Sequence, residues 1–382
     1  MICSADVRTS NDHFIKDVHV YDVPGYDSRF RSGVDSSSKV QLSNTKAPLR
    51  WIYHNTLIRL IWPDYAWLWY IRGLAKAKEL VAEDYPDILI TSSHPFTPHI
   101  IGFQIKKRYP KLKWLVDIGD PFAVLDHVHI NNDFLYSALN KYWEKKVLKT
   151  ADWVSVTVQG IKDIYIEWNT KLSEKIYLMP PISKARPDYS TVYEPIQSGK
   201  LSFVFVGTLY KELRSPKAAL EFFDLFNRIQ TDYKAEIHFI GNPKDCVELI
   251  KQYQNKIGGI YLHGQVSSEK ANEWVKSADV LINVGNRTTY QVPSKVVVYL
   301  SAQKPILNFC CIENDTSADV FTDWPMALSI KPKDNYEEKI KEFIKILQTQ
   351  ANYTQKDLKK KIAPYQLSKV SNSYLKCIQG NQ

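Results

Sequence analysis

Short apolar runs rich in β-branched residues alternate with longer amphipathic stretches, and this alternation limits the fold more than any other feature of the chain. It predicts parallel sheets covered by helices on both faces. We expect a first series of strands at Val18–Tyr21, Ile88–Thr91, Trp114–Asp117, Trp153–Thr157 and Ile176–Met179. A second series is expected at Phe203–Val206, Glu236–Ile240, Ile260–His263, Val280–Val284, Ile306–Phe309 and Ala327–Ile330. Two series in tandem predict an α/β protein with two Rossmann-like, doubly wound domains.

The boundary between the two series is visible in the composition. Pro180-Pro181 ends the first series, and a polar, proline-containing stretch precedes the strand that opens at Leu201. Such a stretch is typical of an interdomain linker. We expect an N-terminal domain over 1–182, a linker over 183–200, a C-terminal domain over 201–364 and a terminal helix over 365–382.

The start of the chain differs from the usual beginning of such a sheet. Open α/β sheets that bind nucleotides commonly begin with a strand and a glycine-rich turn. Residues 1–14 are polar and contain no glycine. The first domain therefore either lacks this first strand and glycine-rich loop or has them remodelled.

Charge and cysteine content limit the possible binding partners and the cellular compartment of the protein. The formal net charge is +9, but the basic residues are scattered and match no nucleic-acid-binding motif, so we expect no nucleic-acid partner. A diphosphate substrate and an anionic membrane surface fit this charge better. The five cysteines form no C-x-x-C pair, and from the residue pattern we expect neither a signal peptide nor a membrane-spanning stretch. We expect a cytoplasmic protein without a disulfide framework or structural zinc, either in solution or at the inner face of the membrane.

Two loops of the first domain carry candidate site residues, because ligands of doubly wound sheets bind at the carboxyl ends of the strands. The loop after Ile88–Ile90 offers Ser92, Ser93, His94 and His99 to polyols or phosphate, although Thr97 capping a helix with Pro98 is an alternative reading. The loop after Trp114–Val116 carries Asp117 and Asp120. They are candidate acid–base groups or ligands for sugar hydroxyls, and a Gly-Asp-Pro turn is the alternative.

Two loops of the second domain each place cations ahead of a helix. The first combines Gly207 and Thr208 with Lys211 and Arg214, before a helix that we expect to begin near Ser215-Pro216. The second contains Tyr290, Ser294 and Lys295, with a helix expected from Ser294. Cations beside helix N-termini are typical of a diphosphate site, whereas solvated loop charges are the alternative.

The segment from Leu49 to Val81 mixes tryptophans with basic residues. Such a segment can rest on a bilayer interface, but a pair of core helices with exposed basic residues would have the same composition.

Taken in order, these loops resemble GT-B glycosyltransferases of family 4, in the branch that builds bacterial surface polysaccharides. The resemblance runs from about Trp62 to the end of the chain. In the first domain it rests on Asp87–Ile101, Asp117–Phe122 and Ala151-Asp152. In the second domain it rests on Phe205–Tyr210, Ala278–Leu281, Val292–Lys295, Tyr299-Leu300 and Lys304–Leu307.

This resemblance implies a retaining, metal-independent transfer of a sugar from a nucleotide-sugar donor to a glycan or lipid-linked acceptor. It implies donor binding by Gly207, Thr208, Lys211, Arg214, Tyr290, Ser294 and Lys295, and acceptor binding by Ser92, Ser93 and His99. Asp120, with Asp117 or His94, would act in catalysis, and the terminal helix would return to the first domain.

The sequence departs from the family at one position in particular. Relatives usually carry Glu, which binds the nucleotide ribose, where this chain has Val298. This departure favours a catalytically degenerate homologue that acts as a binding partner. A sugar-nucleotide epimerase on the same fold is a further alternative, and it would need additional acid–base residues that the sequence does not identify.

Overall fold

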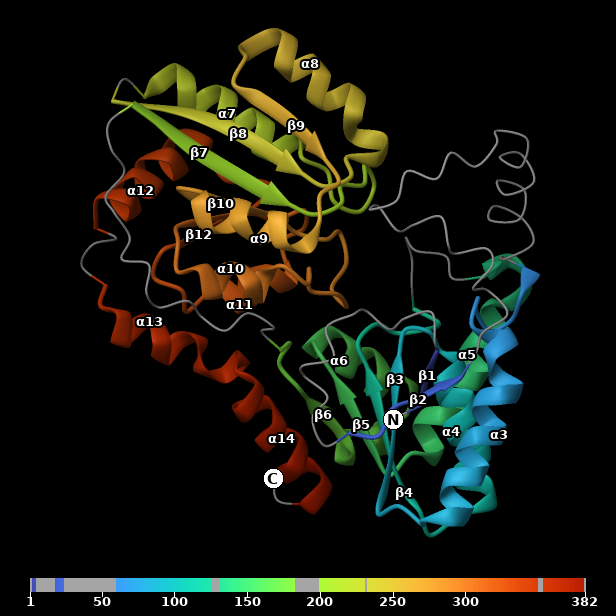
Figure 1. The fold of residues 1–382 in the computed structure, drawn as a ribbon. Helices are drawn as coiled ribbons and strands as arrows, with labels where there is room; N and C mark the ends of the chain where they lie inside the picture. The colour runs from blue at the N-terminus through green and yellow to red at the C-terminus, as the bar shows by residue number, and fades with distance from the viewer. Residues whose placement is uncertain are drawn as a thin grey trace. The chain divides into compact units, whose positions relative to one another are not determined.

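The computed structural model describes residues 2–4, 18–23, 60–124, 131–182, 199–230, 232–349 and 353–380. The chain forms two compact units, Met1–Leu178 and Met179–Gln382. Figure 1 shows that strands and helices alternate in both. Most of the stretch expected as the linker, residues 183–198, lies outside the described residues.

The described residues of unit 1 form two parallel sheets. Strands β1 (Ile2–Ser4) and β2 (Tyr21–Val23) pair with each other, and β3 (Ile88–Ser93), β4 (Lys113–Ile118), β5 (Trp153–Val156) and β6 (Ile176–Leu178) form a four-stranded sheet in chain order. The helices are α3 (Trp67–Glu83), α4 (Thr97–Arg108), α5 (Asp133–Thr150) and α6 (Gln159–Trp168). Buried side chains of β4 and β5, Leu115 and Val154 among them, explain why these strands read as continuous apolar runs.

The start of unit 1 corrects one expectation. A strand does occupy Ile2–Ser4, and it pairs in parallel with a strand at Tyr21–Val23 rather than at Val18–Tyr21. Each is three residues long. Strands this short show no detectable alternation, so the sequence pattern could not reveal the first or place the second accurately.

Unit 2 is a six-stranded parallel sheet in the order β12-β11-β10-β7-β8-β9. Its strands are β7 (Gly199–Val206), β8 (Tyr233–Ile240), β9 (Ile260–Gly264), β10 (Val280–Val284), β11 (Ile306–Phe309) and β12 (Ala327–Ile330). Its helices are α7 (Lys217–Ile229), α8 (Val247–Ile257), α9 (Ser268–Ser277), α10 (Val296–Ala302), α11 (Thr316–Phe321), α12 (Tyr336–Thr349), α13 (Gln355–Ile362) and α14 (Leu367–Gln379). Every strand of the second predicted series is confirmed.

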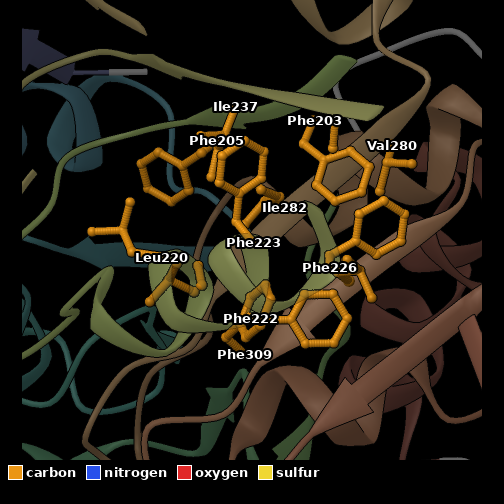
Figure 2. Packing of buried hydrophobic residues seen from close by; sticks show 14 of the residues in the cluster. Phe203, Phe205, Leu220, Phe222, Phe223, Phe226, Ile237, Val280, Ile282 and Phe309 are labelled. Carbon is orange, nitrogen blue, oxygen red and sulfur yellow. The ribbon is translucent and has the colours of Figure 1, made fainter. Parts of the chain in front are cut away.

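The core of unit 2 lies in two layers, one on each face of the sheet. Phenylalanines dominate the layer under α7, α8 and α12, where the rings of Phe203 and Phe226 lie 5.5 Å apart and Phe222 packs on Phe309 (Figure 2). Aliphatic side chains dominate the opposite layer, under α9, α10 and α11. Successive strand residues supply opposite layers, as the period of two requires.

The strand order of unit 2 determines where a ligand would bind. From the central β7 the chain continues to β8 and β9 on one side, then crosses to β10, β11 and β12 on the other. The order therefore reverses between β7 and β10, which pair directly from Val280↔Phe203 to Ile282↔Phe205. Ligands of open α/β sheets bind outside the carboxyl ends of the strands at such a reversal.

An Ala-Asp pair precedes one strand in each unit and has a structural role in both. Asp152 accepts hydrogen bonds from Lys106 Nζ (2.7 Å) and the Trp114 amide (2.9 Å), which joins β5 to β4. Asp279 accepts hydrogen bonds from the amide (2.8 Å) and hydroxyl (2.9 Å) of Ser202, which joins β10 to β7. These aspartates organise the amino ends of the strands, at the edge of the sheet opposite the candidate site.

Candidate functional site

The two cation-bearing loops of unit 2 meet at the carboxyl ends of β7 and β10. The Arg214 guanidinium donates to Asn286 Oδ1 through Nε (3.0 Å) and Nη2 (2.7 Å), and its Nη1 donates to the carbonyl of Thr208 (3.3 Å). The Arg287 amide donates to the carbonyl of Leu213 at 2.8 Å. The structure thus brings together the loops that the sequence marked separately.

Arg214 is largely buried, and its hydrogen-bond partners among the described residues are neutral. Within the described parts of the chain it forms no ion pair, and burial lowers the pKa of its guanidinium. Three of its five N–H groups are used in the contacts to Asn286 and Thr208. Asp315 opposes the lowering of the pKa of Arg214 electrostatically but is not ion-paired with it. A desolvated cation with unused donors and no ion pair among the described residues favours an anionic ligand.

Lys295 is the second cation at this edge of the sheet. It is half-buried immediately before α10, and burial lowers the pKa of its ammonium group. No ion pair to it occurs among the residues that the structure describes. Lys211 and Ser294 are exposed in the same two loops, and the Lys211 amide donates to Asp245 Oδ1 at 2.9 Å.

Glycines keep the backbone close-packed at this edge. Gly241 follows β8 with a φ of +124°, and a Cβ there would lie 2.0 Å from the carbonyl oxygen of Gly207. A Cβ on Gly285, after β10, would lie 1.7 Å from Oδ2 of the buried Asp315. Gly241 and Gly285 are thus required for packing within the protein, whereas the approach of the Gly207 backbone to a ligand stays a prediction.

Tyr290 is buried, with only 4% of it exposed, whereas a side chain that contacts the donor was expected at the surface.

Helix α10 is anchored to the end of β7. The OH of Tyr299 on this helix accepts a hydrogen bond from the Val206 amide at 2.9 Å. Val298, at the position where a ribose-binding Glu was expected, is half-buried in the same helix.

In unit 1, the structure joins the first two candidate loops through Asp117. Its Oδ2 accepts a hydrogen bond from Ser92 Oγ (2.9 Å) and its Oδ1 accepts one from Ser155 Oγ (2.6 Å). Ser93 Oγ donates to the backbone carbonyl of Asp120 at 3.3 Å. The sequence pattern did not mark Ser155, which lies on β5 beside β4.

His94 is the exposed imidazole of this edge, and Asp120 is its acidic neighbour. Packing around His94 lowers the pKa of the imidazole, and the nearby Asp120 and Asp64 carboxylates oppose that shift. His94 therefore lies close enough to Asp120 for the two groups to influence each other electrostatically.

His99 is not a surface ligand, which corrects its assignment to acceptor binding. The side chain is fully buried, its Nδ1 lies 2.7 Å from Thr91 Oγ1, and Thr91 also accepts a hydrogen bond from the Trp114 indole (3.0 Å). Burial, with a smaller contribution from His94, lowers the pKa of His99 to about 3. His99 is thus a neutral core residue.

The N-terminus of α4 is also occupied in a way that the sequence did not predict. Thr97 is the first helical residue and does not cap the helix with its side chain. Instead, Asp64 Oδ2 accepts hydrogen bonds from the amides of Phe96 (2.6 Å) and Thr97 (2.9 Å), and Asp64 Oδ1 accepts one from Thr97 Oγ1 (2.8 Å). Since a protein carboxylate takes these donors, this helix end does not serve as the phosphate or polyol site considered from the sequence.

Two negative observations apply to the described residues. They contain no group of three or more His, Cys, Asp or Glu side chains arranged to hold a metal ion. Among them, no helix combines the length and the apolar character that crossing a membrane requires.

Comparison with known proteins supports the architecture. No family model matches the chain. A protein of Methanocaldococcus jannaschii described as an uncharacterized glycosyltransferase is 30% identical over 207 residues, which cover 52% of this chain and 51% of that protein. The match thus spans about half the length of this curated relative.

Solved structures match between 81% and 100% of the chain at low sequence identity. A lipopolysaccharide outer core galactosyltransferase matches with a TM-score of 0.59 and 12% identity, over 97% of this chain and 87% of its own. The N-terminal domain of Candida albicans trehalose-6-phosphate phosphatase matches with a TM-score of 0.64 and 13% identity, over 100% and 96%. The Anabaena protein HepE, solved in complex with UDP, matches with a TM-score of 0.57 and 10% identity, over 81% and 82%. The chain therefore has the α/β fold of GT-B glycosyltransferases, with two Rossmann-like domains.

Proposed function

We propose that this protein is a glycosyltransferase that binds the diphosphate of a nucleotide-sugar donor at the β7–β10 edge of unit 2. The observation that carries the proposal is the placement of Arg214 and Lys295 at the reversal of strand order, as two desolvated cations that form no ion pair with any residue that the structure describes. A diphosphate would supply the missing negative charge. These cations would also stabilise the charge that develops on the leaving nucleoside diphosphate, so the proposal needs no metal ion.

The remaining donor contacts follow from the same loops. Lys211 and Ser294 are exposed in these loops and would contact the donor, and the backbone at Gly207 and Thr208 lies beside the Arg214 guanidinium. Because its ring is buried, Tyr290 would support the donor-binding loop by packing beneath it.

Unit 1 would supply the acceptor side and the acid–base groups. Asp120 and His94 share one edge of the sheet with Asp117 and Ser92, which are hydrogen-bonded to each other. This combination of carboxylates, an imidazole and hydroxyls is suited to binding a sugar hydroxyl and moving its proton. We propose that transfer proceeds with retention, to a glycan or lipid-linked acceptor of surface-polysaccharide synthesis.

A peripheral contact with an anionic membrane is part of the proposal. Helix α5 exposes Phe134 (95%), Leu135 (54%) and Tyr142 (55%), and Lys145 and Lys146 follow on the same helix. Exposed apolar side chains next to lysines are typical of surfaces that rest on lipid headgroups. A lipid-linked acceptor would be reached from such a surface.

One observation favours a second candidate, a catalytically inactive homologue that binds nucleotide sugars or a partner. Val298 cannot accept hydrogen bonds from ribose hydroxyls, so a contact expected in an active enzyme is lost.

The experiment that separates the two candidates is steady-state release of nucleoside diphosphate from a nucleotide sugar. Under our proposal the wild-type protein releases it, Lys295→Ala abolishes turnover, and Asp120→Asn lowers kcat far more than donor affinity. Donor binding without any turnover in the wild type would establish the inactive homologue instead. Unchanged kinetics in Lys295→Ala would refute the diphosphate assignment.

A further inference from the structure

The two unit 1 loops that carry the proposed acid–base groups contain the same short pattern. His94-Pro95-Phe96 follows β3, and Asp120-Pro121-Phe122 follows the adjacent β4. The rings of Phe96 and Phe122 stack with their centroids 4.1 Å apart and their planes 7° from parallel. Each phenylalanine thus lies two residues after a proposed acid–base group, and the stacked pair connects the two loops.

A buried carboxylate holds each of these phenylalanines by its backbone. Glu144 on α5 accepts hydrogen bonds from the Phe122 amide at Oε1 (2.7 Å) and from the Ala123 amide at Oε2 (2.8 Å). Asp64 does the same for Phe96 and the residue after it, through its Oδ2. Both carboxylates are completely buried, with an exposed fraction of 0%.

Neither carboxylate forms an ion pair with any described residue; both are held by neutral donors. The Tyr165 hydroxyl is the third donor to Glu144, at 2.6 Å, and the Ala66 amide is a further donor to Asp64, at 2.9 Å. Burial raises the pKa of both groups, although the hydrogen bonds oppose the shift. A neutral or apolar side chain would be less costly to bury, so global stability alone does not account for two such carboxylates.

We propose that Glu144 and Asp64 are positioning residues that hold Asp120 and His94 as a pair. Each of them would do so by fixing the two backbone amides that lie two and three residues after Asp120 or His94. This inference rests on the proposed function, because it assigns Asp120 and His94 to the reaction. Neither positioning residue needs to touch substrate. At Glu144 a carboxylate is suited to the task because each of its two oxygens accepts one of the adjacent N–H groups, whereas a glutamine would present its own donor to one of them.

The test measures the His94–Asp120 pair directly and does not depend on turnover. The charged or titratable groups that act on His94 are Asp120, Asp64 and the neutral His99. The pKa of His94 is followed by NMR in the wild type, with its resonance assigned by loss of the signal in His94→Gln. Asp120→Asn removes one carboxylate that raises this pKa, so the pKa of His94 falls.

The decisive variants alter the hydrogen bonds between Glu144 and the Phe122 and Ala123 amides, and they leave Asp120 intact. Glu144→Gln displaces the Asp120 loop, so the pKa of His94 falls by at least half as much as in Asp120→Asn. Glu144→Asp keeps the charge but is one methylene too short for both amides, and it serves as the second variant if Glu144→Gln does not fold. Tyr165→Phe is the matched control, because it removes another hydrogen bond from the same carboxylate and spares the two amide contacts.

An unchanged His94 pKa in the Glu144 variants would overturn the inference, as would an equal fall in Tyr165→Phe or no fall in Asp120→Asn. If the wild type turns over a nucleotide sugar, Glu144→Gln lowers kcat about 10- to 100-fold with the donor KM unchanged, because small misplacements of reacting groups cost about that much. Tyr165→Phe stays within about twofold of the wild type. A wild type without turnover on any nucleotide sugar would refute the proposed function, while the His94 titration would still decide whether Glu144 positions the pair.

Discussion

Replacing Arg214 by Met tests the donor site most sharply, because it removes one charge and leaves a side chain of similar length. Three of the five guanidinium N–H groups bind Asn286 and Thr208, so two remain for a phosphate. Hydrogen bonds to charged groups contribute about 1.5–3 kcal/mol each. Two such bonds amount to about 3 kcal/mol or more, which corresponds to at least about a hundredfold loss of affinity.

The assay is calorimetric titration with UDP, GDP and TDP, repeated at two salt concentrations. The matched control is Lys200→Met, which removes the same charge from the amino end of β7, at the opposite edge of the sheet. Lys200 is exposed and paired with Glu236 at 2.6 Å, so its loss should leave nucleotide affinity within about twofold. Equal affinities of Arg214→Met and the wild type, or equal losses in both variants, would refute the reasoning.

Three further predictions follow from individual contacts. Val298→Glu should tighten donor binding about tenfold by supplying an acceptor for ribose hydroxyls, and unchanged affinity in the same titration would show that ribose is held elsewhere. Gly285→Ala should lower the free energy of unfolding in urea by about 1–3 kcal/mol, because its Cβ would displace Asp315 from the Ser317 amide at the start of α11; wild-type stability would contradict this. Asp152→Asn should cost about 1–3 kcal/mol near pH 7. Burial raises the pKa of Asp152, but Lys106 and the other hydrogen-bond donors outweigh burial and lower this pKa in the folded state. The difference in unfolding free energy between the wild type and Asp152→Asn should therefore persist above about pH 4 and vanish as the pH falls through the folded-state pKa. A difference that grows in acid would contradict this prediction.

The strand pattern was predictable from sequence wherever strands are buried on both faces. β10 is buried along its whole length, and its β-branched residues stand out against the polar loop that follows. The meeting of the Gly207 and Gly285 loops follows from strand order, which the alternation of elements predicts only as a class of fold. That Arg214 reaches Asn286 rather than a carboxylate depends on the path of one loop, which the residue pattern does not contain.

The unit 1 loops show where residue pattern is ambiguous. Thr97-Pro98 reads as a capped helix start, but a carboxylate 33 residues earlier in the chain supplies the hydrogen bonds. Asp64 interrupts an apolar stretch, and nothing local distinguishes such an interruption from an exposed turn. Glu144 lies on the buried side of α5 with Asn140 and Val147, but the apolar Phe134 and Leu135 of this helix are exposed, so the residue pattern does not mark its buried face. His99 read as a ligand because its loop is polar, whereas tertiary packing decides which side of the helix faces the core.

The central claim is that unit 2 binds a nucleotide-sugar donor that the protein uses for transfer. The measurement that tests it most directly is a thermal-shift and hydrolysis screen of the purified protein against UDP, GDP, TDP and CMP sugars. We predict that one nucleotide class stabilises the protein and slowly loses its sugar, and that Lys295→Ala abolishes both responses. The absence of stabilisation and hydrolysis with every donor, in a protein that melts cooperatively, would contradict the account.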